Sequence, residues 1–409
     1  MRSVAEFYQD CLSAVAQQPP LDVQLADAVS CVLAEDVEAP FDLPVADLAA
    51  RDGYAVRSED LAGARPDNEL SLRVTEEIRA GDVNPAALVP GTAIRIASGA
   101  PMPAGADSVI ALEFTDHGMA QVNVRTQPAV GENIRRKAED VEEGEIVLRK
   151  GTRVGARQVA LLAGVGRSRV YVHPRPRVVI LSIGDEIVEP GEKARPGTVF
   201  DANGHALSTA IADAGAQTFR VAAVPDERHV LSETIEDQLV RADLILTTGG
   251  ISHGSGDTVR EVLSTLGTVR FDNIAAWPGH ILGVGTVGGD DSGEGGTPIF
   301  CLPGDPVSAQ VCFEVFVRPA LRHMQGWTQL TRASVKAAVD RSWYSPRGRR
   351  KLVRVRLVGD PKTGYQAKVM GAPASLLLSA LAESNALAIV PESTTNVHTG
   401  DMLQCLVLE

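Results

Sequence analysis

The sequence predicts a multidomain α/β protein built around a parallel sheet. Its 409 residues are too many for one ordinary core, so two to four domains are expected. Between residues 178 and 324, apolar runs typical of buried strands alternate with helix-length segments, which is the pattern of βαβ units. Before residue 140 and after residue 325, short alternating runs separated by Gly and Pro predict β-rich regions.

Composition indicates a globular protein and excludes two kinds of partner. Hydrophobic residues make up 44% of the chain and charged residues 22%, as in a well-packed soluble protein. The net charge of −13 argues against nucleic-acid binding through a basic surface. No apolar stretch approaches the roughly 20 residues of a membrane span, and Glu6 and Asp10 lie where a signal peptide would be apolar. We therefore expect a cytoplasmic protein that is not inserted in a membrane.

The cysteines predict no metal centre. They are scattered, odd in number and without a close pair, so they are expected to be reduced, buried thiols rather than zinc ligands. They are Cys11, Cys31, Cys301, Cys312 and Cys405.

The first part of the chain begins with a helix and continues into a β-rich insert. Ser3 and Glu6 form a capping box that opens the helix, and Pro19-Pro20 lies beyond its end. Short alternating runs then predict strands at 70–74, 92–96 and 121–124.

Proline-rich residues 173–177 are a stiff linker and the clearest domain boundary. Before the linker, residues 141–172 are expected to form a strand, a helix and a strand. The expected domains are a discontinuous one at 1–44 and 141–172, a β-rich one at 45–140, an α/β one at 173–325 and a C-terminal β domain at 326–409.

The α/β region has clear element boundaries. An apolar strand at 178–183 precedes a helix that starts at Asn203. Asp226 is a good N-cap for the next helix. Asp305 followed by Pro306 opens a helix over 307–324, because proline is favoured at the first helical position.

Three loops follow strands of the predicted parallel sheet, at 182–186, 247–257 and 302–308. In such a sheet, ligands bind beyond the carboxyl ends of the strands. The loops combine backbone donors and hydroxyls, which suit phosphate, with carboxylates, which suit Mg²⁺. Each loop alone is compatible with an ordinary turn that needs Gly for its geometry and Asp for capping. Together they predict a pocket for a nucleotide or phosphate.

Five short motifs are spread along nearly the whole chain. They are 52–56 (Asp-Gly-Tyr-Ala-Val), 94–101 (Ile-Arg-Ile-Ala-Ser-Gly-Ala-Pro), 133–140 (Asn-Ile-Arg-Arg-Lys-Ala-Glu-Asp), 247–252 (Thr-Thr-Gly-Gly-Ile-Ser) and 302–309 (Leu-Pro-Gly-Asp-Pro-Val-Ser-Ala). In these motifs and their order the chain resembles the MoeA family, the molybdenum-inserting enzymes of molybdenum-cofactor biosynthesis. The eukaryotic relative of this family is the E domain of gephyrin.

The resemblance implies a fold, an assembly and a reaction. It implies a discontinuous helical subdomain, a β-rich insert, a MogA-like α/β nucleotide-binding domain and a C-terminal β-barrel-like domain. It also implies an elongated homodimer with its active site between the α/β domain of one subunit and the first two subdomains of the other. The implied reaction joins molybdate to adenylylated molybdopterin and releases AMP with Mg²⁺.

The resemblance also implies roles for individual residues. Asp226 and Asp257 would hold Mg²⁺ beside Glu186, and the opposite subunit would supply Asp52, Ser98 and Asp140. The loop expected to cradle the phosphate contains Thr247, Thr248, Gly249, Gly250 and Ser252. The residues expected around molybdate and the adjoining substrate are Arg135, Arg136, Pro278, Gly279, His280, Pro303, Gly304, Asp305, Ser308, Arg349, Arg354 and Ser375.

The chain departs from the family pattern where anions are bound. Two lysines of the family's loop are Trp277 and His280 here, so the loop keeps its Pro-Gly turn but loses its fixed positive charges. The family's Pro-Gly-Asn-Pro carries Asp305 instead of asparagine. In the working enzyme, the lost cations would be replaced by arginines at positions 51, 135, 136 or 349.

An alternative function follows from the same departures. The chain could keep the dimer but serve as a gephyrin-like scaffold that binds short peptide tails of membrane or cell-division proteins. Residues 340–356 concentrate positive charge beside Trp343 and Tyr344, a combination typical of peptide-binding hot spots. The same run is also compatible with a solvated strand face.

Overall fold

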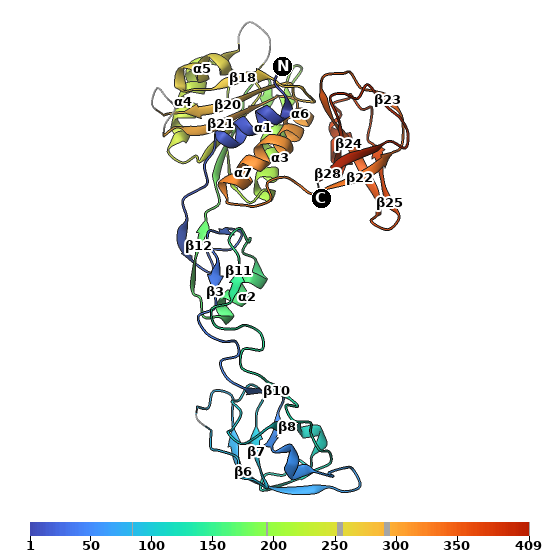
Figure 1. Cartoon of the computed structure of the whole chain (residues 1–409). Helices are drawn as coiled ribbons and strands as arrows, with labels where there is room; N and C mark the ends of the chain where they lie inside the picture. The colour runs from blue at the N-terminus through green and yellow to red at the C-terminus, as the bar shows by residue number, and fades with distance from the viewer. Residues whose placement is uncertain (84, 194, 252–256, 290–294, 409) are drawn as a thin grey trace. The chain divides into compact units, whose positions relative to one another are not determined.

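The computed structural model describes residues 1–83, 85–193, 195–251, 257–289 and 295–408. The chain folds into two compact units (Figure 1). The first comprises Met1–Ala34, Gly151–Val154 and Tyr171–Glu409, and the second comprises Glu35–Lys150 and Gly155–Val170.

A six-stranded sheet lies at the centre of the first unit, in the order β16-β13-β17-β21-β20-β18. The first four strands are parallel, and the last two are each antiparallel to the preceding strand. The predicted α/β fold with a parallel sheet is therefore confirmed. The strands are β16 (Gln217–Arg220), β13 (Arg177–Ser182), β17 (Leu244–Thr248), β21 (Thr297–Leu302), β20 (Ile281–Val287) and β18 (Arg270–Asn273).

Helices cover both faces of this sheet (Figure 1) because side chains along each buried strand alternate between the faces. On one face, Val178 and Ile180 pack with α1 (Val4–Ser13), α3 (Ala202–Asp213), α6 (Pro306–Cys312) and α7 (Arg318–Met324). On the other face, Val179 and Leu181 pack with α4 (Arg228–Leu239) and α5 (Thr258–Leu266).

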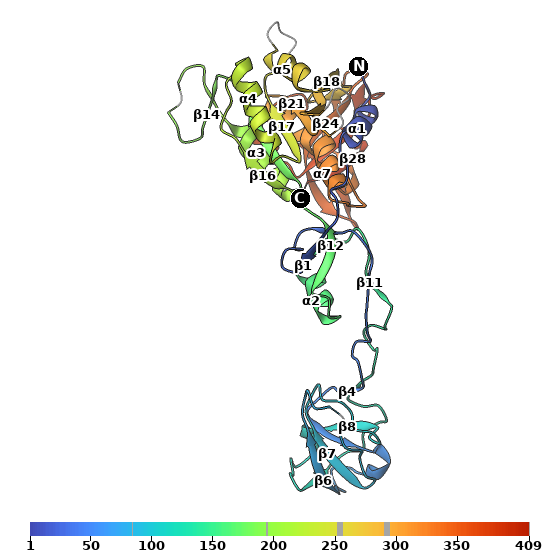
Figure 2. The same cartoon turned by 90° about the vertical axis from the view of Figure 1, so that its left-hand side faces the viewer.

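The N-terminal helix α1 belongs to this α/β core. Its predicted capping box is present, since the Ser3 hydroxyl accepts from the Glu6 amide and the Glu6 carboxylate accepts from the Ser3 amide. The rings of Phe7 and Phe316 meet edge to face with centroids 5.1 Å apart, and α1 lies beside α7 in Figure 1 and Figure 2. The expected four domain boundaries stay predictions; the contacts themselves group α1 with the α/β sheet.

Two predicted helix boundaries were wrong. Helix α4 begins at Arg228 with Glu227 at its N-cap, so Asp226 is left outside the helix. The segment expected to be one helix over 307–324 contains a π turn at Phe313–Val317 between α6 and α7. Pro319 lacks the amide hydrogen that a regular helix would donate to residue 315, which favours the wider turn.

The C-terminal part of the first unit is a closed five-stranded barrel. Its strand order is β24-β25-β22-β28-β26, and pairing of β24 with β26 closes it. The expected β-barrel-like domain is thus confirmed. Its strands are β22 (Ser334–Val339), β24 (Arg350–Asp360), β25 (Gly364–Val369), β26 (Ala386–Val390) and β28 (Met402–Val407).

One strand of the α/β region joins the barrel. Strand β19 (Ala276–Trp277) pairs in parallel with β24, so that Ala276 is opposite Arg350 and Trp277 is opposite Lys351. The smaller elements of the first unit are β1 (Leu21–Gln24), β2 (Val32–Leu33), β14 (Ile187–Val188), β15 (Val199–Phe200), β23 (Trp343–Tyr344), β27 (Asn396–Val397) and α8 (Leu378–Ala382).

The second unit contains a five-stranded sheet in the order β8-β5-β7-β6-β9. Its strands are β8 (Ser108–Ala111), β5 (Gly53–Val56), β7 (Thr92–Ile96), β6 (Leu70–Ile78) and β9 (Gln121–Val124). The three alternating runs predicted as strands all lie in this sheet. The other elements are β3 (Val37–Glu38), β4 (Leu48–Ala49), β10 (Ile134–Arg135), β11 (Ile146–Leu148), α2 (Ala156–Gly164), the short 3-10 helices η1 (Ser58–Leu61) and η2 (Leu112–Phe114), and β12 (Arg169–His173), which is shared with the first unit.

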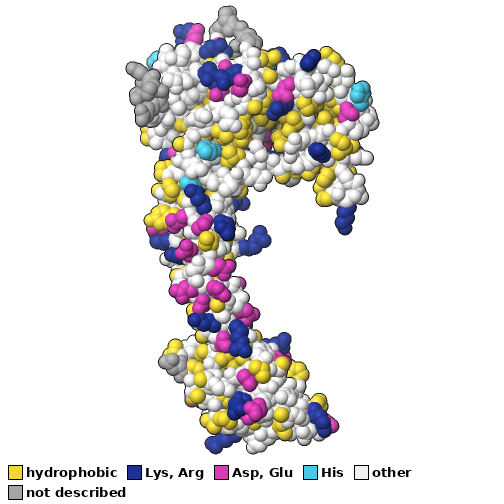
Figure 3. Space-filling model, viewed as in Figure 1, with side chains coloured by type: hydrophobic (Ala, Val, Ile, Leu, Met, Phe, Trp, Pro, Cys, Tyr) yellow, Lys and Arg dark blue, Asp and Glu magenta, His cyan; other side chains and the backbone are white. Residues whose placement is uncertain are grey.

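Charged side chains of both signs are interspersed on the face shown in Figure 3. Within the described ranges, no helix combines the length and the apolar character that crossing a membrane requires.

Candidate functional site

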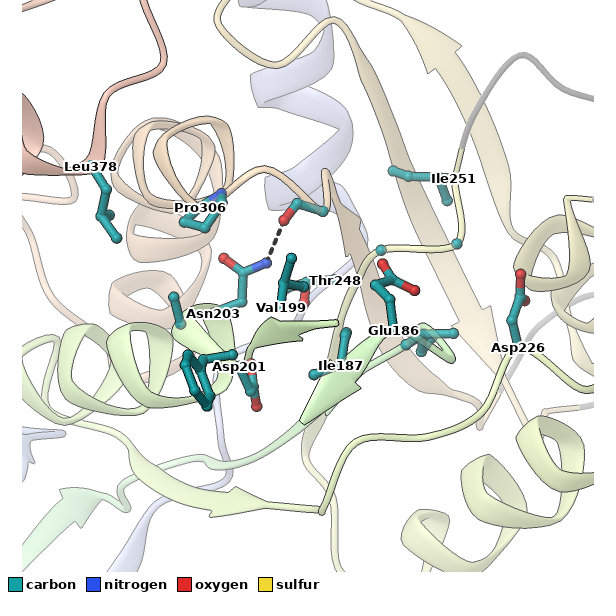
Figure 4. A pocket seen from close by; sticks show the side chains of 16 residues that line it. Glu186, Ile187, Val199, Asp201, Asn203, Asp226, Thr248, Ile251, Pro306 and Leu378 are labelled. Carbon is teal, nitrogen blue, oxygen red and sulfur yellow. Dashed lines mark hydrogen bonds between the residues drawn. The ribbon is translucent and has the colours of Figure 1, made fainter. Parts of the chain in front are cut away.

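A cavity of about 560 Å³ lies at the carboxyl ends of β13, β17 and β21. Figure 4 shows the side chains that line it. The structure brings residues from all three predicted loops to this cavity. Those expected from the sequence are Glu186, Asp226, Thr248, Gly249, Gly250 and Gly304.

The turn after β17 requires glycine at two positions. Gly249 and Gly250 have φ angles of +86° and +64°, a left-handed conformation that other residues adopt only with strain. A Cβ at Gly249 would overlap the carbonyl oxygen of Ile183, and one at Gly250 would overlap Cγ2 of Val259. The turn therefore exposes backbone to the cavity, as a phosphate cradle requires.

One end of the cavity is acidic. Glu186 and Asp226 both line it, and the Asp226 amide donates to Oδ1 of Asp185 at 3.0 Å. In the described part of the chain, no cluster of three or more His, Cys, Asp or Glu side chains could hold a metal ion. Two carboxylates do fit Mg²⁺, which usually takes one or two from the protein and the remaining ligands from water and substrate phosphate.

Asp257 and Thr247 are not among the residues that line the cavity. Asp257 caps α5, where its side chain accepts from the Arg260 amide at 3.3 Å and lies 3.2 Å from Nε of Arg260. Thr247 is buried in β17. Ser252 lies outside the described residues, as do the four residues between it and Asp257.

The sequence did not identify Asp201 and Asn203 as lining residues. Asp201 is buried and accepts from the hydroxyl of Ser182 at 2.9 Å and the amide of Gly204 at 2.8 Å. Its Oδ2 also lies 3.1 Å from the guanidinium of Arg220. The signal was an Asp-Ala-Asn triplet at a helix start, which predicts a cap and says nothing of a pocket. The lining residues Ile183, Ile251 and Pro306 lie in the three predicted loops. The apolar lining residues that were also missed are Ile187, Val199, Phe200, Ala202 and Leu378.

A second group of expected residues meets where α6 begins. Asp305 caps α6 by accepting from the amide of Ser308 at 2.8 Å. Gly279 has a φ of +81°, and a Cβ there would lie 3.7 Å from the Ser308 carbonyl oxygen and 3.8 Å from Pro303. The 278–280 turn therefore packs on α6 and on the loop that precedes it.

Arg354 is a buried cation beside this group. Only 3% of it is exposed, and its Nη2 donates to the carbonyl and to the hydroxyl of Ser375. Its Nη1 is buried and has no hydrogen-bond partner among the described residues. Burial lowers the pKa of Arg354, while the negative charge of Asp305 partly offsets that effect. Arg349 is partly exposed.

The lysine-free loop has a buried lysine as its neighbour in the sheet. The rings of Trp277 and His280 are stacked with centroids 6.3 Å apart. Trp277 is paired in register with Lys351, which is 6% exposed and whose Nζ lies 3.5 Å from the Tyr344 carbonyl oxygen. Burial lowers the pKa of Lys351. The burial of Lys351 could not be predicted from its place in a run of basic residues.

Several members of the basic run at 340–356 are buried or paired with a carboxylate. Arg354 and Lys351 are buried, and Arg350 lies 3.0 Å from Glu392. Tyr344 is exposed, and so are Arg341, Arg347 and Arg356, so that only part of the positive charge of the run is buried. The alternative of a peptide-binding scaffold gains no support from this surface.

The candidates in the second unit are exposed. Oδ1 of Asp52 accepts from the amide of Ser98 at 2.8 Å, so these two residues are adjacent. Arg136 is paired with Asp47 at 2.6 Å. Arg51 lies 3.5 Å from Glu113 and is therefore already paired with a negative charge. Arg135 and Asp140 are exposed at β10 and in the loop that follows it.

The fold and the cavity define a multidomain α/β protein with a cavity at the carboxyl ends of its parallel strands. Three family models match the chain: MoeA N-terminal region (domain I and II) at residues 2–166, probable molybdopterin binding domain at 179–323 and MoeA C-terminal region (domain IV) at 336–408. The chain belongs to the MoeA family.

Individual relatives agree with this assignment over their full length. The chain is 39% identical over 428 residues to molybdopterin molybdenumtransferase 1 of Mycobacterium tuberculosis, covering 100% of this chain and 99% of the relative. It is also 39% identical over 410 residues to molybdopterin molybdenumtransferase 2 of that organism, covering 99% of each. A crystal structure of a molybdopterin biosynthesis MoeA protein from Pyrococcus horikoshii matches with a TM-score of 0.77 at 30% identity and covers 100% of both chains. The resemblance found in the sequence is thereby confirmed.

Proposed function

We propose that this protein is a molybdopterin molybdenumtransferase, which joins molybdate to adenylylated molybdopterin and releases AMP. The observation that carries the proposal is the cavity at the sheet edge, where a glycine turn and two carboxylates meet. Relatives that share 39% of its residues over their full length carry this enzyme's name.

The lining residues suit the phosphate end of the substrate. Amides of the 249–251 turn would bind the phosphate, and Glu186 with Asp226 would hold Mg²⁺ against it. When bound, Mg²⁺ would neutralise the charge that develops as AMP leaves. Asp257 would complete this set only through a change in its present pairing with Arg260.

The group at the start of α6 suits molybdate. The free Nη1 of Arg354 is a donor that an oxyanion can use without breaking an existing bond. Ser375 holds the guanidinium in place, and Ser308 lies in the first turn of α6, where its amide donates to Asp305. Asp305 adds a negative charge to the same group, so binding of an anion there depends more strongly on the positive charge of Arg354.

Release of AMP from adenylylated molybdopterin, dependent on molybdate and Mg²⁺, tests this function. Glu186→Gln and Asp226→Asn should each lower the rate roughly 10- to 100-fold or more, because each removes a metal ligand. Glu227→Gln is the matched control, since Glu227 is exposed, follows Asp226 directly and does not line the cavity. Full activity of both acidic-end variants would contradict the assignment.

The homodimer and a cytoplasmic location are part of the proposal. The resemblance implies that Asp52, Ser98 and Asp140 would lie opposite the cavity of a second subunit, which would explain an exposed Asp52–Ser98 pair. Light scattering at micromolar concentration tests the assembly, and a monodisperse monomer would contradict it.

A further inference from the structure

Asn203 lines the cavity and carries a hydrogen-bond acceptor that is unpaired among the described residues. Its Nδ2 donates to the carbonyl oxygen of Gly304 at 2.8 Å, and only 7% of the residue is exposed. Because the Gly304 carbonyl can only accept, the amide nitrogen must face it, and the free end is therefore the oxygen. That Oδ1 is buried and has no partner among the residues that the structure describes. Leaving a buried acceptor unpaired is costly, so this atom is suited to a ligand donor.

The surface around this oxygen is apolar. Val199 and Phe200 of β15, Pro306 at the start of α6 and Leu378 of α8 line the same cavity. Val199, Phe200 and Leu378 are each about half exposed, at 55%, 47% and 50%. Apolar walls with one fixed polar group between them are typical of sites that bind a flat ring and read one edge of it.

The two kinds of lining are separated along the cavity. Figure 4 shows Asn203 with Pro306 and Leu378 on one side, Asp226 on the far side, and Glu186 between them. The glycine turn, Glu186 and Asp226 would take a phosphate and its metal, as argued above. A ligand that fills the cavity would then place its phosphate there and its ring beside Asn203.

We propose that Asn203 is a specificity-determining residue that accepts a hydrogen bond from the exocyclic amino group of a heteroaromatic ring. The inference rests on the proposed function only for the choice of rings, since adenylylated molybdopterin carries two, adenine and a pterin. An oxo group in place of the amino group would set a second acceptor against Oδ1 and leave both unpaired. The site should therefore prefer the amino form of whichever ring it holds.

Equilibrium binding of two ligand pairs to the full-length protein with Mg²⁺ tests this preference. The first pair is AMP and IMP, which differ by an amino or an oxo group on the purine. The second pair is 6-hydroxymethylpterin and 6-hydroxymethyllumazine, which differ in the same way on the pterin. The wild-type protein should bind the amino member of one pair about 10- to 100-fold more tightly, because the oxo member would leave a buried acceptor unpaired.

Three variants separate recognition from a structural role. Asn203→Leu should bring the amino-to-oxo ratio close to one, whereas a merely structural residue would weaken both members equally. Asn203→Asp keeps an acceptor at the free position and should keep the preference even if it folds less stably without the Gly304 bond. Ser208→Ala is the control on the same helix, because its hydroxyl bonds to the Gly204 carbonyl at 2.6 Å and does not line the cavity.

Loss of preference for AMP in Asn203→Leu would assign the residue to adenine, and loss of preference for the pterin would assign it to that ring. Equal binding of both members of each pair by the wild type would overturn the inference and leave the proposed function intact. An unchanged ratio in Asn203→Leu would overturn it as well. Failure to bind any of the four compounds would overturn both the inference and the proposed cavity.

Discussion

The glycine turn after β17 allows a quantitative test of how the cavity is built. We expect Gly250→Ala to destabilise the first unit for two reasons. A left-handed alanine costs about 1–2 kcal/mol, and the new Cβ would lie well under 3.0 Å from Cγ2 of Val259. Val259 is fully buried on α5 and, as a β-branched residue in a helix, has essentially one χ1 conformation, so it cannot turn away.

The overlap should add about 1–3 kcal/mol, as overpacking usually does. Alanine also restricts the unfolded chain, which stabilises the folded state by roughly 0.4–1 kcal/mol. The net loss is therefore about 2–4 kcal/mol, which corresponds to a fall in melting temperature of roughly 5–10 °C for a unit of this size.

Tryptophan fluorescence can follow this unit alone, because Trp277, Trp327 and Trp343 are the only tryptophans and all lie in it. Val259→Ala should by itself cost about 2 kcal/mol, since two buried methyl groups are lost. In the double variant the overlap is gone. Its loss of folding stability should therefore be about 1–3 kcal/mol smaller than the sum of the losses in the two single variants.

Strict additivity would show that the overlap does not matter and that the geometry of the turn has been misjudged. Binding of AMP with Mg²⁺ should be lost in Gly250→Ala and partly restored in the double variant. Normal binding by Gly250→Ala would show that the turn does not hold the phosphate.

Two further predictions concern the buried cations of β24. Because burial lowers the pKa of Lys351, the unfolded chain binds its proton more tightly, and folding stability should rise with pH between the lowered value and the ordinary value of about 10.4. Lys351→Met should therefore stabilise the first unit at pH 7 by roughly 1 kcal/mol, and this gain in stability should shrink towards pH 10. Thermal unfolding at both pH values measures it, and a gain that does not change with pH would contradict the role of charge. Arg354→Met should weaken molybdate binding about 10- to 100-fold while leaving the fold intact. Arg356 is an exposed arginine on the same strand, so Arg356→Met should not weaken binding. Equal affinity of both variants for molybdate in a direct binding assay would show that Arg354 is not part of the site.

Local patterns in the sequence were sufficient for much of the fold. The capping box at Ser3, the apolar strand at 178–183 and the alternating runs of the second unit depend on neighbours within a few residues, and all are present. The π turn at Phe313–Val317 was missed because the apolar pattern continues through it, although Pro319 was visible in the sequence.

The site was harder to predict because its chemistry depends on distant partners. Asn203 is meaningful only through its bond to Gly304, which lies 101 residues away in the chain. Lys351 and Arg354 looked like part of a basic surface, since the burial of a charge depends on packing that a run of residues does not encode. Asp226 was wrongly predicted as a helix cap, although the resemblance also assigned it to the metal site, because a cap and a cavity carboxylate are the same residue type in the same kind of loop.

The pairing of β19 with β24 has a consequence for how such chains can evolve. Two residues of the α/β region, Ala276 and Trp277, complete the hydrogen bonding of a strand that belongs to the barrel. A barrel exchanged between relatives by recombination near residue 326 would meet a foreign edge strand and a foreign partner for Lys351. The 274–280 loop and the first half of β24 should therefore be inherited together. A chain that ends before the barrel would leave β19 as an unpaired edge open to aggregation.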